Sequence, residues 1–355
     1  MCWPKLVAHL GRIAENASKV VEFCASAGVT VAAVTKGVCS DLRVAGAMIE
    51  GGCASFGDSR VQNLACLKKE FPRIPRTLLR IPMKSELEDV VQFTDSSLVS
   101  MTESIEALEA RCLRLGATHK VILMFDLGDR REGIFSEEIE AFVEVLRRTS
   151  HVALQGVGVN FGCFAGVLPS AAALRRLCSA REALEKELGY SVPVCSGGAT
   201  SSLALLERGE LPPGVNQLRV GEAILLGQDV TWQRTIPWLR HDTIYLEAEV
   251  VETRFKSSLP EGETGRDAFG KSRTFEDKGK RRRAIVAVGR QDAPVEGLVP
   301  WDPGLQVLGG SSDHTILDVT DAEEPPRWGD ALRFSVDYAA MLGLMTSPYV
   351  FKEYR

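Results

Sequence analysis

The spacing of hydrophobic and polar positions changes repeatedly along this chain. Short runs of apolar residues recur at regular intervals after residue 28, and segments with apolar residues every three or four positions separate them. The runs have the length of buried strands, and the segments between them have the pattern of amphipathic helices. The expected strands cover residues 29–35, 54–57, 77–81, 97–101, 120–126, 152–159, 192–196 and 215–219.

Eight strand–helix units in succession predict a (β/α)8 barrel, a TIM barrel of class α/β. The same apolar strands could also form an open, doubly wound sheet. The regular repetition and the lack of a Gly-x-Gly-x-x-Gly turn favour the barrel. A barrel places its catalytic groups at the carboxyl ends of its strands, so candidate residues are sought there.

The pattern changes after about residue 240, where helical spacing nearly disappears and turn residues cluster between short alternating stretches. Further strands are expected at residues 243–253, 284–289, 306–308, 315–319 and 333–336. We therefore expect a barrel domain over residues 1–238 and a smaller, mainly β domain over residues 239–355. A short strand at residues 5–9 and a helix to about residue 27 precede the first barrel strand.

Composition and charge narrow the class of protein. The 355 residues are 45% hydrophobic and carry a net charge of −5, which indicates a soluble globular protein without a general attraction to nucleic acid. No apolar run approaches the roughly 20 residues of a membrane span, and the first residues lack a signal-peptide pattern. Nine cysteines without a Cys-x-x-Cys pair indicate free thiols in a reducing cytoplasm and no metal site.

A basic stretch ends the polar segment 271–283. It could be a nucleic-acid or targeting patch, but the acidic charge of the whole chain favours a solvated loop that enters a strand. We therefore expect neither a nucleic-acid nor a membrane partner.

Three features near expected strand ends could carry chemistry. Lys36 follows the first barrel strand, and an uncharged neighbourhood there would lower its pKa and make its amine a nucleophile, although a surface lysine would look the same. Residues 195–202 (CSGGATSS) combine glycines and hydroxyl groups before a helix, which suits a phosphate, although a plain capped turn would look similar. Arg219 lies within an apolar strand, where its charge needs a partner. Together these features suggest a pyridoxal 5'-phosphate barrel.

Five motifs in order along the chain resemble the alanine racemase family, and most closely its alanine/ornithine racemase branch. They are residues 33–36 (AVTK), 126–133 (DLGDRREG), 218–227 (LRVGEAILLG), 289–292 (GRQD) and 311–318 (SSDHTILD). Each motif alone is weak, but the ordered set covers nearly the whole chain. The resemblance implies an amino-acid racemase of fold type III that requires pyridoxal phosphate and forms a head-to-tail homodimer.

The resemblance also assigns roles to single residues. Lys36 would bind the cofactor covalently and move the proton at Cα on one face, and Arg219 would face the pyridine nitrogen. Arg131 would lie near the substrate carboxylate. The residues expected at the cofactor phosphate are Thr200, Gly221 and Glu222, the last two through their backbone N–H groups.

Three positions depart from the family pattern. Ser40 replaces a phosphate-binding tyrosine, for which Tyr349 is a loose substitute, and Asn160 replaces a histidine near the pyridine ring. Arg290 replaces the tyrosine that carries the second proton in alanine racemases. Because a guanidinium is rarely neutral, we interpret Arg290 as an anchor for the substrate carboxylate.

The second proton carrier is then expected in the loop with Asp313 and His314, with Asp313 ranked first and also expected to contact the substrate. Ornithine is the first expected substrate, followed by alanine or another basic amino acid. A side-chain ammonium needs a carboxylate, for which Asp129, Glu132 and Asp313 are candidates. The alternatives are a non-catalytic pyridoxal phosphate-binding protein, which the second domain argues against, and a decarboxylase or an aldolase-like lyase.

Overall fold

The computed structural model describes residues 3–272 and 274–355 and divides the chain into two compact units. One unit is Gly11–Arg240, which we call the barrel unit. The other, the β unit, combines the described residues up to Leu10 with His241–Arg355. Within the described residues, no helix is both long and apolar enough to cross a membrane.

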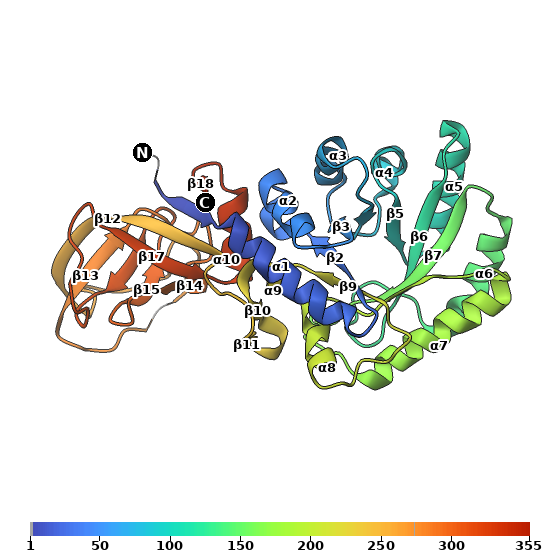
Figure 1. Cartoon of the computed structure of the whole chain (residues 1–355). Helices are drawn as coiled ribbons and strands as arrows, with labels where there is room; N and C mark the ends of the chain where they lie inside the picture. Colours follow the sequence, from blue (N-terminus) through green and yellow to red (C-terminus); the bar gives the residue numbers. More distant parts are fainter. Residues whose placement is uncertain (1–2, 273) are drawn as a thin grey trace. The chain divides into compact units, whose positions relative to one another are not determined.

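Eight parallel strands of the barrel unit close into a barrel in chain order (Figure 1). They are β2 (Thr30–Val34), β3 (Ser55–Asp58), β4 (Arg76–Leu78), β5 (Ser96–Val99), β6 (His119–Phe125), β7 (Val152–Val159), β8 (Val194–Ser196) and β9 (Gln217–Val220). The last strand pairs with the first, with Thr30 opposite Gln217, so the sheet has no free edge. The predicted (β/α)8 barrel is confirmed.

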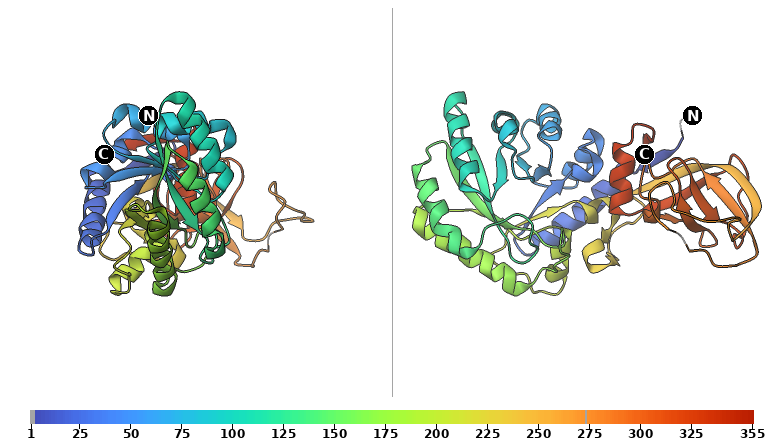
Figure 2. Two further views of the ribbon diagram at one scale, coloured as in Figure 1. Left: turned by 90° about the vertical axis from the view of Figure 1, so that its right-hand side faces the viewer. Right: turned by 180° about the vertical axis from the view of Figure 1, so that it is seen from behind.

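Helices lie on the outside of the barrel strands (Figure 2). They are α1 (Leu10–Ala25), α2 (Leu42–Glu50), α3 (Val61–Glu70), α4 (Leu87–Phe93), α5 (Thr102–Leu115), α6 (Ile139–Arg148), α7 (Ala171–Leu188), α8 (Leu203–Glu207) and α9 (Glu222–Leu226). Each longer helix buries one apolar stripe; in α7 the buried positions include Leu174, Leu177 and Leu184. The hydroxyl of Ser170 accepts a hydrogen bond from the N–H of Ala173 at the start of α7.

The β unit is built on an eight-stranded sheet in which long β-hairpins replace helical crossovers. Its strands are β1 (Lys5–Ala8), β12 (Ile244–Ser257), β13 (Lys280–Val286), β14 (Leu298–Pro300), β15 (Gln306–Gly310), β16 (Thr315–Asp318), β17 (Ala331–Val336) and β18 (Phe351–Tyr354). A helix, α10 (Tyr338–Thr346), also belongs to the β unit, whereas the two-stranded hairpin of β10 (Gln228–Asp229) and β11 (Arg234–Thr235) belongs to the barrel unit. The expected mainly β character of the second domain is confirmed.

Residues 3–10 belong with the β unit, whereas the expected division placed them in the barrel domain. Strand β1 is antiparallel to β12, with Lys5 opposite Glu247, and parallel to β18, with Lys5 opposite Phe351. Its side chains Leu6 and Val7 are buried there. The chain therefore enters the β unit twice, before and after the barrel.

Candidate active site

Lys36 opens a short 3₁₀ helix, η1 (Lys36–Val38), directly after β2 at the carboxyl end of the barrel strands. Its side chain is largely buried, and no hydrogen bond or ion pair engages it among the residues that the structure describes. Burial lowers the pKa of Lys36, and the positive charges of Arg131 and Arg219 lower it further, while Cys163 and Asp58 act in the opposite direction. A lysine in this state supplies a neutral amine more readily than a surface lysine does.

A buried carboxylate anchors the turn that carries Lys36. Asp58, at the end of β3, accepts hydrogen bonds from the hydroxyls of Thr35 at 2.8 Å and Ser40 at 2.7 Å. Cys39 and Ser40 both adopt a φ of 51°, a left-handed conformation that this turn imposes on side-chain-bearing residues. The Ser40 hydroxyl, expected near the cofactor phosphate, is therefore part of the support beneath Lys36.

Arg219 lies on β9 and is almost completely buried inside the barrel. Its Nη1 donates to Ser196 Oγ at 2.5 Å, and its Nη2 donates to the carbonyl of Val159 at 2.7 Å and to Asn160 Oδ1 at 2.8 Å. Burial lowers the pKa of Arg219 to about 10, so the guanidinium stays protonated at neutral pH. Its hydrogen-bond partners among the described residues are all neutral, and this buried donor suits an acceptor such as a pyridine nitrogen.

Asn160, at the end of β7, connects Arg219 to a second arginine. Its Nδ2 donates to Glu132 Oε1 at 2.6 Å. Arg131 donates to the same carboxylate through Nε and, at 2.6 Å to Oε1, through Nη2. The structure thus brings together Arg131, Asn160 and Arg219, which sequence analysis named, and adds Glu132 as the link between them.

The stretch after β8 provides a small cradle of hydroxyl and backbone groups. The 3₁₀ helix η4 (Thr200–Ser202) begins there, and the Thr200 hydroxyl accepts from the N–H of Ala223 in α9 at 3.2 Å. A Cβ on Gly221 would lie 3.0 Å from the carbonyl of Val34, so this approach of β9 to β2 needs glycine. Glu222 directs its carboxylate to the N–H of Val230, 3.1 Å away.

Ser201 is a site residue that sequence analysis did not single out. Its hydroxyl is buried and has no hydrogen-bond partner in the part of the chain that the structure describes. A buried hydroxyl without a partner is costly unless a ligand accepts its hydrogen bond. This orphaned donor, in a cradle with Thr200 and Gly221, fits a phosphate group, and the signal for it was the run of hydroxyl residues 200–202.

Asp129 has a structural task in the loop after β6. It is buried, and its carboxylate accepts hydrogen bonds from the backbone N–H groups of Cys163, Phe164 and Ala165 at 3.0–3.2 Å. These contacts fix the loop after β7 and occupy both of its oxygens.

The remaining expected site residues lie in the β unit. The Arg290 guanidinium binds Glu296 through two nitrogens, with Nη1 3.0 Å from Oε2, and the Arg290 N–H donates to the carbonyl of Ser311 at 2.8 Å. Asp313 and His314 lie exposed in the turn between β15 and β16, where Asp313 accepts from the hydroxyl of Ser312 at 2.8 Å.

The structure therefore brings Arg290 and the turn 311–314 together. Tyr349 is 65% exposed between α10 and β18.

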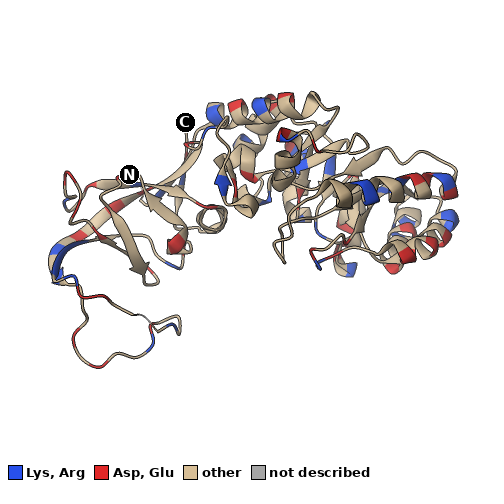
Figure 3. Cartoon of the chain, turned by 90° about the horizontal axis from the view of Figure 1, so that it is seen from below, with Lys and Arg blue, Asp and Glu red and all other residues tan. Residues whose placement is uncertain are grey.

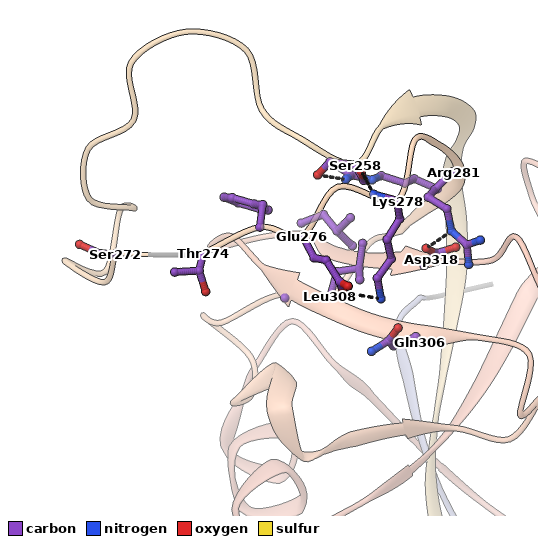
Figure 4. A pocket seen from close by; sticks show the side chains of 13 residues that line it. Ser258, Ser272, Thr274, Glu276, Lys278, Arg281, Gln306, Leu308 and Asp318 are labelled. Carbon is purple, nitrogen blue, oxygen red and sulfur yellow. Dashed lines mark hydrogen bonds and ion pairs between the residues drawn. The ribbon is translucent and has the colours of Figure 1, made fainter.

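A separate cavity of about 580 Å³ lies in the β unit, between the strand surface and the segment after β12 (Figure 4). Four of its charged side chains form two ion pairs, Lys278 with Glu276 at 3.3 Å and Arg281 with Asp318 at 2.8 Å, and a fifth, Arg283, donates to the carbonyl of Ser258 at 3.1 Å. The basic stretch noted in the sequence enters β13, while acidic and basic residues interleave along the outer helices (Figure 3).

Comparisons with known proteins agree with this geometry. Residues 8–229 match the family model described as the N-terminal domain of alanine racemase. A lysine racemase of Thermotoga maritima is 41% identical over 354 residues, which cover 100% of this chain and 99% of the relative. An ornithine racemase of Acetoanaerobium sticklandii is 38% identical over 352 residues, with 99% of each chain covered.

Solved structures share the fold at lower identity. An alanine racemase of Streptomyces lavendulae matches with a TM-score of 0.76 and 16% identity, covering 100% of this chain and 97% of that one. An alanine racemase from E. faecalis matches with a TM-score of 0.71 and 17% identity, covering 99% of this chain and 98% of that one. A D-threonine aldolase of Filomicrobium marinum matches with a TM-score of 0.74 and 16% identity, covering 96% of this chain and 88% of that one. With its family model, its full-length racemase relatives and its buried lysine at the barrel mouth, the chain belongs to the alanine racemase family of pyridoxal phosphate-dependent amino-acid racemases.

Proposed function

We propose that the protein racemises basic α-amino acids, with ornithine and lysine as its first substrates. The observation that carries the catalytic proposal is Lys36, a buried amine without a partner among the described residues at the carboxyl end of the barrel, with its pKa lowered by burial. The two full-length relatives support the choice of basic substrates.

The residues present suit pyridoxal phosphate. Lys36 would hold the cofactor covalently, and the orphaned hydroxyl of Ser201 would bind its phosphate together with Thr200 and the backbone of Gly221 and Glu222. When bound, this cofactor supplies an electron sink that makes the Cα proton of an amino acid acidic. Arg219, with a pKa of about 10, would donate a hydrogen bond to the pyridine nitrogen rather than a proton.

Two proton carriers on opposite faces of Cα produce inversion. Lys36 removes or returns the proton on one face, and its lowered pKa makes the neutral, proton-accepting amine more available than in an ordinary lysine. Asp313 is proposed for the other face, with His314 orienting it. Solvent-deuterium exchange at Cα, measured from each enantiomer separately, tests the pair: Asp313→Ala should abolish exchange from one enantiomer only, and symmetric exchange would contradict this role.

Three carboxylates are candidates for binding the side-chain ammonium of a basic substrate. Asp129 accepts hydrogen bonds from backbone N–H groups. Glu132 accepts hydrogen bonds from Arg131 and Asn160. Asp313 is exposed and accepts one hydroxyl hydrogen bond among the described contacts. Asp313 is less engaged, but it is already proposed as the proton carrier at Cα, and one carboxylate cannot act at Cα and bind the distal ammonium at once, so none of the three is assigned to the ammonium.

The decisive experiment incubates the cofactor-loaded enzyme with each enantiomer of ornithine, lysine and alanine and follows inversion by chiral chromatography. We expect inversion of ornithine and lysine in both directions, and none with Lys36→Ala. Lys84→Ala, which changes an exposed lysine, is the matched control and should retain activity. Inversion of alanine alone would contradict the substrate proposal, and loss of carbon dioxide would identify a decarboxylase.

We also propose that two copies assemble head to tail, so that Asp313 and Arg290 of one copy serve the barrel of the other. The family resemblance and the exposure of the turn 311–314 support this arrangement. Mixing inactive Lys36→Ala with inactive Asp313→Ala should restore up to about a quarter of wild-type activity, because half of the dimers are mixed and each mixed dimer has one intact site. No recovery, or a monomer mass by light scattering, would contradict it.

A further inference from the structure

We infer that Glu132 is a positioning residue that holds both cationic side chains of the site, Arg131 directly and Arg219 through Asn160. The inference rests on the proposed racemase function and names the group that orients its substrate carboxylate. It also removes Glu132 from the candidates for the substrate's side-chain ammonium.

The backbone fixes the position of Glu132. The chain returns to β6 directly after it, where the Ile134 N–H donates to the carbonyl of Met124 at 2.8 Å and the Asp126 N–H donates to the carbonyl of Ile134 at 3.0 Å. Gly133 has a φ of +143°, and a Cβ there would lie 2.3 Å from the nitrogen of Asp126. The loop therefore closes tightly on the strand, and its shape leaves Glu132 little freedom.

The contacts of Glu132 leave one edge of Arg131 open. The carboxylate binds the Nε and Nη2 nitrogens, which form one side of the planar guanidinium. No contact of Nη1 is present among the described residues, and the Arg131 side chain is 37% exposed. The open edge with Nη1 can bind a second carboxylate through two parallel hydrogen bonds, which matches the α-carboxylate of an amino acid.

The same carboxylate determines the orientation of the Asn160 amide. A carboxylate only accepts hydrogen bonds, so Asn160 must turn its NH2 group toward Glu132, at 2.6 Å from Oε1. Its Oδ1 then faces Nη2 of Arg219 at 2.8 Å, as an acceptor facing a donor. Without the carboxylate the amide could flip, and its NH2 group would then oppose the donor of Arg219.

Charge adds to this geometry. Two arginines within one site repel each other, and Glu132 is the carboxylate whose charge acts on both of them. The direct partners of Arg219 are neutral, so Glu132 compensates its buried charge from beyond Asn160. A carboxylate already bound to one arginine and one amide has little remaining capacity for a substrate ammonium.

The test compares a substrate that has a side-chain ammonium with one that lacks it. Ornithine and norvaline share the α-carboxylate and the chain length, but norvaline has no side-chain amine. If Glu132 positions Arg131, Glu132→Gln should raise both the KM for ornithine and the inhibition constant of norvaline at least tenfold, and kcat should change less. A rise for ornithine alone would show that Glu132 binds the distal ammonium and would overturn the inference.

A second readout follows the Arg219 branch. Glu132→Gln and Asn160→Leu should both shift the visible absorption band of the bound cofactor, or its pH dependence, because Arg219 loses its oriented partner in each variant. Asn160→Leu should change the KM less than Glu132→Gln does, because it leaves Arg131 paired. An unchanged band in both variants would overturn this branch.

Two further variants complete the design. Glu140→Gln makes the same chemical change at an exposed position of α6 and should leave the KM, the inhibition constant and the band unchanged. If Glu132→Gln does not fold, Glu132→Asp keeps the charge and shortens its reach. The KM for ornithine and the inhibition constant of norvaline should again rise equally. If the wild-type enzyme inverts no amino acid, the proposed function fails, whereas norvaline binding and the cofactor band still test Glu132.

Discussion

Individual buried charges define the chemistry of this site. Lys36 has no partner among the described residues and a lowered pKa, whereas Arg219 keeps its proton although it is surrounded by neutral acceptors. The first is suited to covalent attachment and proton transfer, and the second to a permanent hydrogen-bond donor. Two residues of the same charge thus have opposite tasks because their surroundings differ.

Reduction with borohydride should mark Lys36. The enzyme with bound cofactor is expected to lose its visible absorption on reduction and to yield a phosphopyridoxyl adduct on the peptide that contains Lys36. Mass spectrometry of the digested protein measures it. Lys84→Ala should behave like the wild type, and an adduct that persists in Lys36→Ala on another lysine would contradict the assignment.

Replacing the buried cation should change the fate of the substrate. Arg219→Glu places a carboxylate opposite the pyridine nitrogen, which favours the protonated ring and a stronger electron sink. We expect the yield of keto acid relative to inverted amino acid to rise at least tenfold, measured by chromatography of both products. Arg219→Lys keeps a cation there and should show a smaller rise, and an unchanged product ratio in Arg219→Glu would place Arg219 away from the ring.

At the scale of elements, a buried histidine links two neighbouring barrel strands, β5 and β6. Strand β6 begins at His119, which is buried and whose Nε2 lies 3.0 Å from the hydroxyl of Ser97 on β5, while its Nδ1 has no partner among the described residues. Burial lowers the pKa of His119 to about 4. This residue couples the pairing of two strands to its protonation state.

The His119 pKa predicts a loss of stability in mild acid. In the unfolded chain the pKa is near 6.5, so between pH 6.5 and about 4 the unfolded state binds a proton that the folded state does not. This contribution to the unfolding free energy is fully present above pH 6.5 and falls by up to about 3 kcal/mol as the pH drops toward 4. The unfolding free energy, measured by urea unfolding, should differ less between pH 7 and pH 5 for His119→Gln than for the wild type. An equal difference would contradict the prediction.

Much of the barrel could be predicted from sequence because its strands are continuous apolar runs and helices with a clear period separate them. The helix α10 was missed because it is apolar on most sides and shows little periodicity, and β18 because its four residues carry no strong alternation. The site residues that were predicted stand next to strand ends, as Lys36 and Arg219 do. The task of Glu132 depends on a contact between two loops, which local sequence does not encode, whereas the run of hydroxyl residues 200–202 marks the position of Ser201 but not its lack of a partner.

At the scale of the whole molecule, one connection in the β unit is long and exposed. The segment between β12 and β13 has little secondary structure, and its described residues 259–272 and 274–279 are nearly all exposed. The strands that flank it pair along their length, from Val250 opposite Val286 to Ser257 opposite Lys280. A cut in the segment would therefore leave the sheet intact.

Limited trypsin digestion should cut this segment first, after Arg266 or Lys271, because exposed backbone outside a ladder reaches the protease most easily. The two fragments should separate on a denaturing gel but migrate together in size-exclusion chromatography. Because trypsin can also cut after Arg273 and Lys278, replacing all four of these basic residues of the segment with Gln should slow the first cut. First cleavage within the barrel unit, or dissociation of the fragments, would contradict the prediction.

The position of β1 has a consequence for protein synthesis. On a ribosome, all eight barrel strands emerge before β12, and β18 emerges last of all. Strand β1 emerges before the barrel strands, yet both of its partners come after the barrel, so its apolar residues Leu6, Val7 and Ala8 stay without their native contacts while the barrel folds. During synthesis the chain thus carries an unpaired apolar strand until β12 and β18 have emerged, and such a strand is prone to association with other chains.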